Sequence, residues 1–272
     1  MTRAFGAHML LRRTTEKFRR SNKIGIALGS GGAKGMAHLG VLQALKENGV
    51  EADIYCGTSA GSIVGALCAR GYAPADIVSL LTNLQYGGAA LTAMLSGSLE
   101  PLLGAVDDAL GGVKIEELSK PFCAIATNCS DGSEVRLKTG NAARAVLASS
   151  SIPPLFRGMK VGDSLLADGA FCNAVPGDAA RELGADIVIG VALSPARSYE
   201  QTEFTCSSGE TLLLRQSGFL QCDLLLEPDL SAFHATDIHY APQIYDAGYE
   251  CATRNMAQIL QLCRGAASRK RI

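Results

Sequence analysis

The sequence predicts an α/β fold, a three-layer sandwich in which helices cover both faces of a mostly parallel central sheet. Three observations favour this fold. Short apolar runs of strand length alternate along the chain with segments of helical periodicity. A glycine-rich loop joins the first of these runs to a helix. Residues 57–62, GTSAGS, join the second run to another helix.

The individual elements follow from these patterns and from the residues that interrupt them. Apolar runs bounded by glycine, proline or turn residues predict strands at residues 23–28, 53–56, 121–127, 133–139, 160–170, 185–194 and 223–230. Helical spacing and helix-stop signals predict helices at residues 36–48, 60–70, 74–84, 141–151, 178–184 and 241–262. The pattern weakens between residues 200 and 218, where we expect an exposed loop or a helix.

Residues 23–262 are predicted to form a single domain between two basic segments, an arm at residues 1–22 and a tail at residues 263–272. The arm carries six arginine or lysine residues against one glutamate, together with several apolar side chains. It is either a solvated, loosely ordered extension or a segment that makes peripheral contact with an anionic membrane.

Composition limits the classes of function. The 272 residues carry a formal net charge of −1, which gives no indication of nucleic-acid binding. No apolar run approaches the ~18–20 residues of a membrane span, and the first twenty residues make a poor secretory signal. The nine cysteines form no C-x-x-C pair and lie mostly in apolar runs, so we expect reduced, buried thiols, no metal site and a cytoplasmic location. The sequence indicates no cofactor and no particular oligomeric state.

The loop GSGGAKG, residues 29–35, has three interpretations. The dinucleotide fingerprint G-x-G-x-x-G fails because Lys34 stands where the third glycine belongs. The phosphate loop fails because Gly35, and not serine or threonine, follows Lys34. The third interpretation is an anion hole, in which the amides of Gly31 and Gly32 face a ligand near a helix N-terminus. A tight turn without a ligand is the structural alternative.

Ser59 stands at the centre of a G-x-S-x-G pattern between a strand and a helix, which is the setting of a nucleophile elbow. Gly57 and Gly61 remove side chains that would clash in so sharp a turn. An ordinary strand-to-helix turn is the alternative, because glycine and serine are common in turns.

A serine hydroxyl is a weak nucleophile unless a base lies beside it. One candidate base is Asp168, which ends a predicted strand and precedes a glycine. A triad through His234 or His239 is another, since both histidines come late in the chain after an acid. For His38, on the helix after the glycine loop, a hydrogen-bonded structural role is favoured. These residues taken singly leave the choice of base open.

Taken together, the motifs resemble those of the patatin-like phospholipases. Residues 29–42, GSGGAKGMAHLGVL, look like the oxyanion loop and first helix of that family, and GTSAGS looks like its nucleophile elbow. Residues 148–156, ASSSIPPLF, resemble the segment before its last catalytic strand, and residues 168–176, DGAFCNAVP, resemble its Asp-Gly element. The resemblance runs from about residue 23 to about residue 193.

The resemblance implies a patatin-like fold with a Ser–Asp dyad and no catalytic histidine. Ser59 is then the nucleophile and Asp168 its base, with oxyanion amides from Gly31 and Gly32. The remaining motif residues are Gly57, Gly61, Lys34, Gly35 and Gly169. Two positions depart from the family pattern: Ser30 stands where many members carry glycine, and Asn128 where many carry Asp.

The implied activity is that of a serine acyl hydrolase, of phospholipase A or lysophospholipase type, that cleaves carboxylic esters of lipids or phospholipids without a cofactor. Two alternatives remain open: a catalytically weak regulatory or binding module on the same fold, and a thioesterase or acyltransferase that uses the same serine. Residues 86–103 are either a cap or acyl-chain wall or ordinary core.

Overall fold

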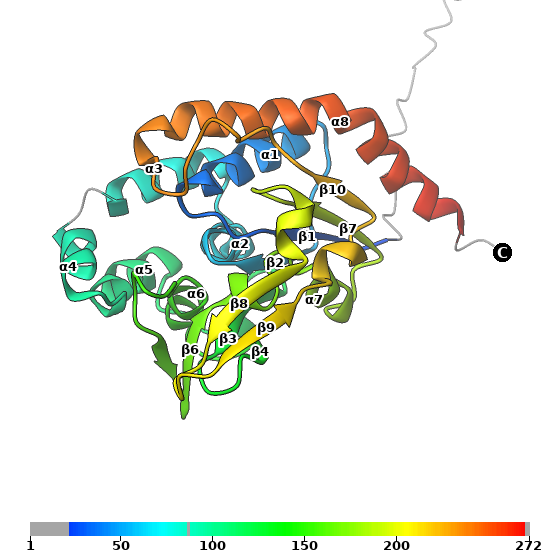
Figure 1. The fold of residues 1–272 in the computed structure, drawn as a ribbon. Helices are drawn as coiled ribbons and strands as arrows, with labels where there is room; N and C mark the ends of the chain where they lie inside the picture. Colours follow the sequence, from blue (N-terminus) through cyan, green and yellow to red (C-terminus); the bar gives the residue numbers. More distant parts are fainter. Residues whose placement is uncertain (1–21, 86–87, 270–272) are drawn as a thin grey trace, which may run out of the picture.

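The computed structural model describes residues 22–85 and 88–269. Residues 1–21 of the predicted basic arm, with the suggested membrane contact, therefore lie outside the described part, as do Tyr86, Gly87 and the last three residues of the chain. Among the described residues, helices cover both faces of an eight-stranded sheet, which confirms the predicted three-layer α/β fold (Figure 1).

The central sheet has the spatial order β10-β7-β1-β2-β3-β6-β5, with β4 also paired to β3. Its strands are β1 (Ile24–Leu28), β2 (Ile54–Thr58), β3 (Phe122–Asn128), β4 (Glu134–Leu137), β5 (Met159–Val161), β6 (Ser164–Asp168), β7 (Ile187–Val191) and β10 (Leu224–Leu226). The run from β10 to β3 is parallel, whereas β4, β5 and β6 add antiparallel pairs beside β3. Strands β1, β2 and β7 are buried at every position, as parallel strands covered on both faces should be.

The helices divide between the two faces of this sheet. They are α1 (Met36–Glu47), α2 (Ala60–Arg70), α3 (Pro74–Gln85), α4 (Gly88–Ser96), α5 (Leu103–Leu110), α6 (Ala142–Ser149), α7 (Gly177–Glu182) and α8 (Ala241–Arg269). Helix α8 continues through most of the segment predicted as a tail. In the described part of the chain, no helix combines the length and the apolar character needed to cross a bilayer.

Strand β1 shows how the sheet separates two cores. Ile26 and Leu28 face a large core that also contains residues of α1, α2, α6 and α8, whereas Ala27 faces a smaller core shared with α7. Successive residues of a strand point to opposite faces, so β1 serves both cores. Figure 1 shows α1 and α8 running side by side over one face, with α7 on the other.

The prediction for residues 200–218 is wrong. These residues form an antiparallel hairpin, β8 (Gln201–Thr205) and β9 (Thr211–Arg215), which is a second, two-stranded sheet. Phe204 is buried, and Leu212 and Leu214 pack with it at the side of the main sheet. The alternation is hard to recognise in the sequence because Leu213, on the opposite side of the hairpin, is exposed and makes β9 look like a continuous apolar run.

Candidate active site

Ser59 lies in the turn between β2 and α2, with φ 55° and ψ −125°. Among the described residues it is the one non-glycine residue with a positive φ, a conformation that is strained for a side chain larger than hydrogen. The flanking glycines are required by packing. A Cβ on Gly57 would overlap the carbonyl oxygen of Gly61, and a Cβ on Gly61 would overlap that of Leu28. The G-x-S-x-G pattern therefore encodes a tight turn that presents the serine side chain.

Two further serines hold this turn in place. The backbone N–H of Ser59 donates to Oγ of Ser149, on α6, at 2.9 Å. Its carbonyl oxygen accepts from Oγ of Ser62 at 2.7 Å. Ser59 itself is only 8 % exposed, and both supporting serines are fully buried. The orientation of Ser59 is therefore fixed from α2 and from α6.

The hydroxyl of Ser59 donates a hydrogen bond to Oδ2 of Asp168 at 2.6 Å. Strand register brings the two residues together across β3: Thr58 is level with Ile125, and Asp168 is level with Ala126, the next residue of β3. Strand β2 runs parallel to β3 and β6 runs antiparallel to it, so the C-terminal end of each strand lies beside the same part of β3. The fold thus brings together two predicted site residues that lie 109 positions apart in the chain.

Asp168 is itself tightly held. Its second carboxylate oxygen, Oδ1, accepts from the N–H of Ala170 at 2.8 Å, and its backbone N–H donates to the carbonyl of Ser151 at 2.9 Å. The side chain of Thr127 donates to the Asp168 carbonyl at 2.8 Å. Gly169 follows directly, where a Cβ would overlap the carbonyl of Ile125. The carboxylate therefore has little freedom to turn away from Ser59.

Burial raises the pKa of Asp168 from 3.8 to about 7. The carboxylate is completely buried, which disfavours its charged form, and the hydrogen bonds from Ser59 and Ala170 offset only part of that effect. A carboxylate with a pKa near neutrality is a far better proton acceptor than an exposed aspartate, and such a group suits general-base chemistry at neutral pH.

The glycine loop passes close to Ser59 because β1 and β2 are neighbours, with Leu28 level with Gly57. Gly31 and Gly32 both line the cavity above Ser59. Within the described part of the chain, neither amide has a hydrogen-bond acceptor, whereas the N–H groups of Ser30 and Ala33 donate to the carbonyls of Ala174 and Ala235. The loop thus holds two unpaired donors at the edge of the cavity.

Close packing explains the glycines of this loop. A Cβ on Gly31 would come within 2.7 Å of Leu193, and Gly32 has a φ of +58° beside the Ala235 carbonyl. A Cβ on Gly35 would come within 2.7 Å of that of Ala60, at the start of α2. Lys34 is half-buried and its side chain does not line the cavity. We therefore assign Lys34 no contact in the site.

His38 makes a hydrogen bond to the start of the glycine loop. The side chain is fully buried, and its Nε2 lies 2.7 Å from the carbonyl oxygen of Gly29. A carbonyl can only accept, so Nε2 carries the proton and Nδ1, which has no partner, is bare. Burial lowers the pKa of His38 to about 4, so the imidazole is neutral at physiological pH. This contact agrees with the structural role favoured for His38 from the sequence.

The other two predicted histidines make no hydrogen bond to Ser59 or Asp168. Both of them, His234 and His239, are exposed. Ser149, which supports the Ser59 turn, is not among the residues predicted from the sequence. It lies in the run Ser149–Ser151, and the sequence offers no signal that separates these three serines, because the difference between them depends on how α6 packs against α2.

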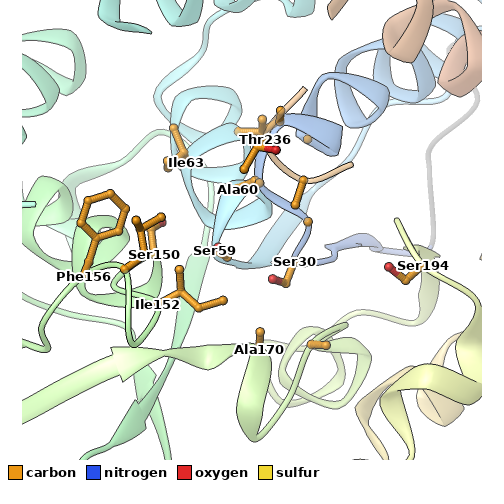
Figure 2. Close-up of a pocket in the computed structure, with 18 of the residues that line it drawn as sticks. Ser30, Ser59, Ala60, Ile63, Ser150, Ile152, Phe156, Ala170, Ser194 and Thr236 are labelled. Carbon is orange, nitrogen blue, oxygen red and sulfur yellow. The ribbon is translucent and has the colours of Figure 1, made fainter. Parts of the chain in front are cut away.

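A cavity of about 670 Å³ opens over Ser59. Figure 2 shows Ile63, Ile152 and Phe156 on one side of Ser59, together with Ser150, and Ser30 and Ser194 on the other. The hydroxyl of Ser150 donates to the Val146 carbonyl, so its hydrogen is used within α6 and its flank. Leu99 and Leu102, from the stretch suggested as a cap or acyl-chain wall, line the cavity, whereas Leu91, Met94 and Leu95 of the same stretch are exposed. Part of that stretch is therefore a wall of the cavity.

The chain is thus an α/β protein with a serine presented on a strand-to-helix turn beside a buried aspartate. The family model for patatin-like phospholipase matches residues 26–181, more than half of the chain. The chain belongs to the patatin-like phospholipase family.

Three similar proteins illustrate this relationship. An uncharacterized NTE family protein of Mycobacterium bovis is 35% identical over 190 residues, covering 66% of this chain and 53% of its own length. Lysophospholipase NTE1 of Saccharomyces cerevisiae is 28% identical over 190 residues, covering 66% of this chain and 11% of its own. The crystal structure of VipD from Legionella pneumophila matches with a TM-score of 0.55 at 14% identity, over 87% of this chain and 67% of that one, which shows a shared fold. The chain spans about half the length of the mycobacterial relative.

Proposed function

We propose that this chain is a serine acyl hydrolase that cleaves carboxylic esters of lipids, with Ser59 as nucleophile and Asp168 as base. The observation that carries the proposal is the 2.6 Å hydrogen bond between Ser59 Oγ and the buried Asp168, at the floor of a largely apolar cavity. Membership of a family named for phospholipase activity supports a lipid ester as the substrate, as does a relative named lysophospholipase.

In the first half of the reaction, Asp168 accepts the proton of Ser59 as Oγ attacks the ester carbonyl carbon. The carbonyl oxygen becomes negatively charged, and the unpaired amides of Gly31 and Gly32 donate to it. Loss of one such donor typically reduces the rate by about 10²–10³. As the tetrahedral intermediate collapses, the proton on Asp168 passes to the departing alcohol oxygen, and the acyl group stays on Ser59.

In the second half, Asp168 accepts a proton from water, which attacks the acyl-serine carbonyl. The same two amides hold the oxyanion, the bond to Ser59 Oγ breaks, and the proton on Asp168 returns to that oxygen. The products are the free alcohol and the fatty acid. The raised pKa of Asp168 fits this alternation, since the group must both take up and release a proton.

Covalent labelling tests the proposal directly. A fluorophosphonate probe would be applied to the wild type, Ser59→Ala and Asp168→Ala, and adducts would be mapped by mass spectrometry. We expect an adduct on Ser59 in the wild type, none in Ser59→Ala, and labelling slowed by orders of magnitude in Asp168→Ala. A folded wild type that stays unlabelled, with or without lipid vesicles, would instead indicate a binding module on this fold.

Labelling alone does not separate a hydrolase from a thioesterase or an acyltransferase. An oxygen ester and a thioester with the same acyl chain would therefore be compared, with and without an acceptor alcohol. We expect the oxygen ester to be cleaved faster and the free fatty acid to be the main product.

A further inference from the structure

We propose that the site selects esters of an uncharged alcohol, of which a monoacylglycerol is the simplest example. This inference rests on the proposed function and adds the chemical class of the substrate. It follows from the side chains that line the two sides of the cavity over Ser59.

The side that would hold the acyl chain is formed by α2, α6, the segment around Leu99 and the loop after α6. Ile63, Leu147 and Phe156 are among its apolar residues, and Figure 2 places Ile63 and Phe156 on the same side of Ser59. Ser30 and Ser194 lie on the opposite side of Ser59 in Figure 2. The hydroxyl of Tyr199, another lining residue, accepts from the N–H of Ser194 at 2.9 Å and so lies beside it. Ser198 and Thr202 also line the cavity. An ester whose carbonyl lies at Ser59 therefore extends its chain to one side and its alcohol to the other.

No charged side chain is among the described residues that line this cavity. A phosphate group that entered the hydroxyl side would lose its water without meeting a lysine or arginine, and burying such a charge unpaired is costly. The hydroxyl groups suit the free hydroxyls of a glycerol unit, which both donate and accept. Lys34 and Arg197 adjoin lining residues in the sequence, but their side chains do not line the cavity.

The test compares substrates that share one acyl chain. Hydrolysis of a monoacylglycerol, a lysophosphatidic acid, a lysophosphatidylcholine and a diacyl phosphatidylcholine would be measured in the same mixed micelles. We expect kcat/KM to be highest for the monoacylglycerol, by at least about tenfold, the effect of a single unsatisfied buried polar group. Equal or faster hydrolysis of any phosphate-bearing substrate would overturn the inference. Loss of that hydrolysis in Lys34→Ala or Arg197→Ala would then identify the cation responsible.

A charge-insertion variant gives a second, independent readout. Ser194→Lys places a cation on the hydroxyl side, and we expect the ratio of kcat/KM for lysophosphatidic acid to that for monoacylglycerol to rise by about tenfold or more. Ser208→Lys, in the turn between β8 and β9, is the matched control and should leave the ratio unchanged. An unchanged ratio in folded Ser194→Lys would argue that the alcohol does not occupy this side.

Fluorophosphonate labelling separates the two ways of failing. If Ser59 is labelled but phosphate esters are preferred, the neutral-alcohol inference falls while the hydrolase proposal stands. If folded protein is neither labelled nor active on any of the four lipids, both fall.

Discussion

The hydroxyl of Ser149 accepts a hydrogen bond from the backbone N–H of Ser59, a contact between residues 90 positions apart that fixes the Ser59 turn to α6. Removing the acceptor leaves a buried N–H unpaired, which costs about 1–3 kcal/mol. For Ser149→Ala we therefore expect kcat to fall about ten- to hundredfold with KM little changed, as steady-state kinetics would show.

Ser151→Ala is the matched control for this variant. Ser151 is also buried, but its hydroxyl donates to the carbonyl of Leu147, one turn earlier in the chain. Its loss should leave kcat close to that of the wild type. Equal losses in the two variants would mean that the effect comes from general loosening of α6 and not from the Ser59 turn.

The raised pKa of Asp168 predicts how activity depends on pH. Only the ionised carboxylate can accept the proton of Ser59, and its pKa is about 7 in the free protein. We expect kcat/KM to rise with pH, by about tenfold per pH unit well below pH 7, and to level off above it. The measurement is kcat/KM for a soluble ester between pH 5 and pH 9. A flat profile across pH 5–7 would contradict the assignment of Asp168 as base.

The same pKa shift predicts that the dyad costs stability. The unfolded chain ionises Asp168 near pH 3.8 and the folded protein only near pH 7. Between these values the folded state binds the extra proton, so raising the pH destabilises it, and above pH 7 the full cost remains. At about 1.4 kcal/mol per pKa unit, this cost is on the order of 4 kcal/mol.

Asp168→Asn should remove that cost and unfold at a higher denaturant concentration than the wild type at pH 8. The advantage should disappear as the pH falls toward 4. The lowered pKa of His38 affects stability in the opposite direction, because the folded protein loses stability as the pH falls from about 6.5 to about 4. Both proteins carry His38, so comparing them at each pH cancels this contribution. A difference in unfolding free energy that does not vary with pH would contradict the predicted shift.

The glycines beside Ser59 should be intolerant of even one methyl group. In Gly61→Ala the new Cβ overlaps the Leu28 carbonyl, which is backbone and cannot give way cheaply. We expect a loss of about 1–3 kcal/mol or more, together with loss of labelling at Ser59. Gly104→Ala, in α5, is the control: its Cβ meets no atom within 4 Å, and it should stabilise the protein slightly. Thermal unfolding of both variants checks the contrast.

Ser59 could be selected from the sequence because its signal is local: Gly57 and Gly61 indicate a tight turn around it. Asp168 was one of several candidate bases on its local signal, the end of a strand before a glycine, and only the resemblance to the patatin-like phospholipases favoured it. Their hydrogen bond could not be derived in this way, because it depends on the antiparallel register of β6 against β3. Ser149 was missed for the same reason, since its role is set by the packing of α6. The β8–β9 hairpin was missed because its buried side consists of few residues, mainly Phe204.

The glycine loop depends on His38, whose Nε2–H donates to the Gly29 carbonyl from a fully buried position. In His38→Leu that carbonyl loses its donor, so the amides of Gly31 and Gly32 should be less well placed, and labelling of Ser59 should slow by about tenfold or more. His38→Gln offers an amide N–H in the same region and should recover part of the rate. Either substitution at this buried position can also lower the stability of the fold. Thermal unfolding of both variants therefore measures any loss of stability separately from the change in labelling rate. Equal labelling rates in folded His38→Leu and His38→Gln would contradict a role for the hydrogen bond and leave His38 as a packing residue.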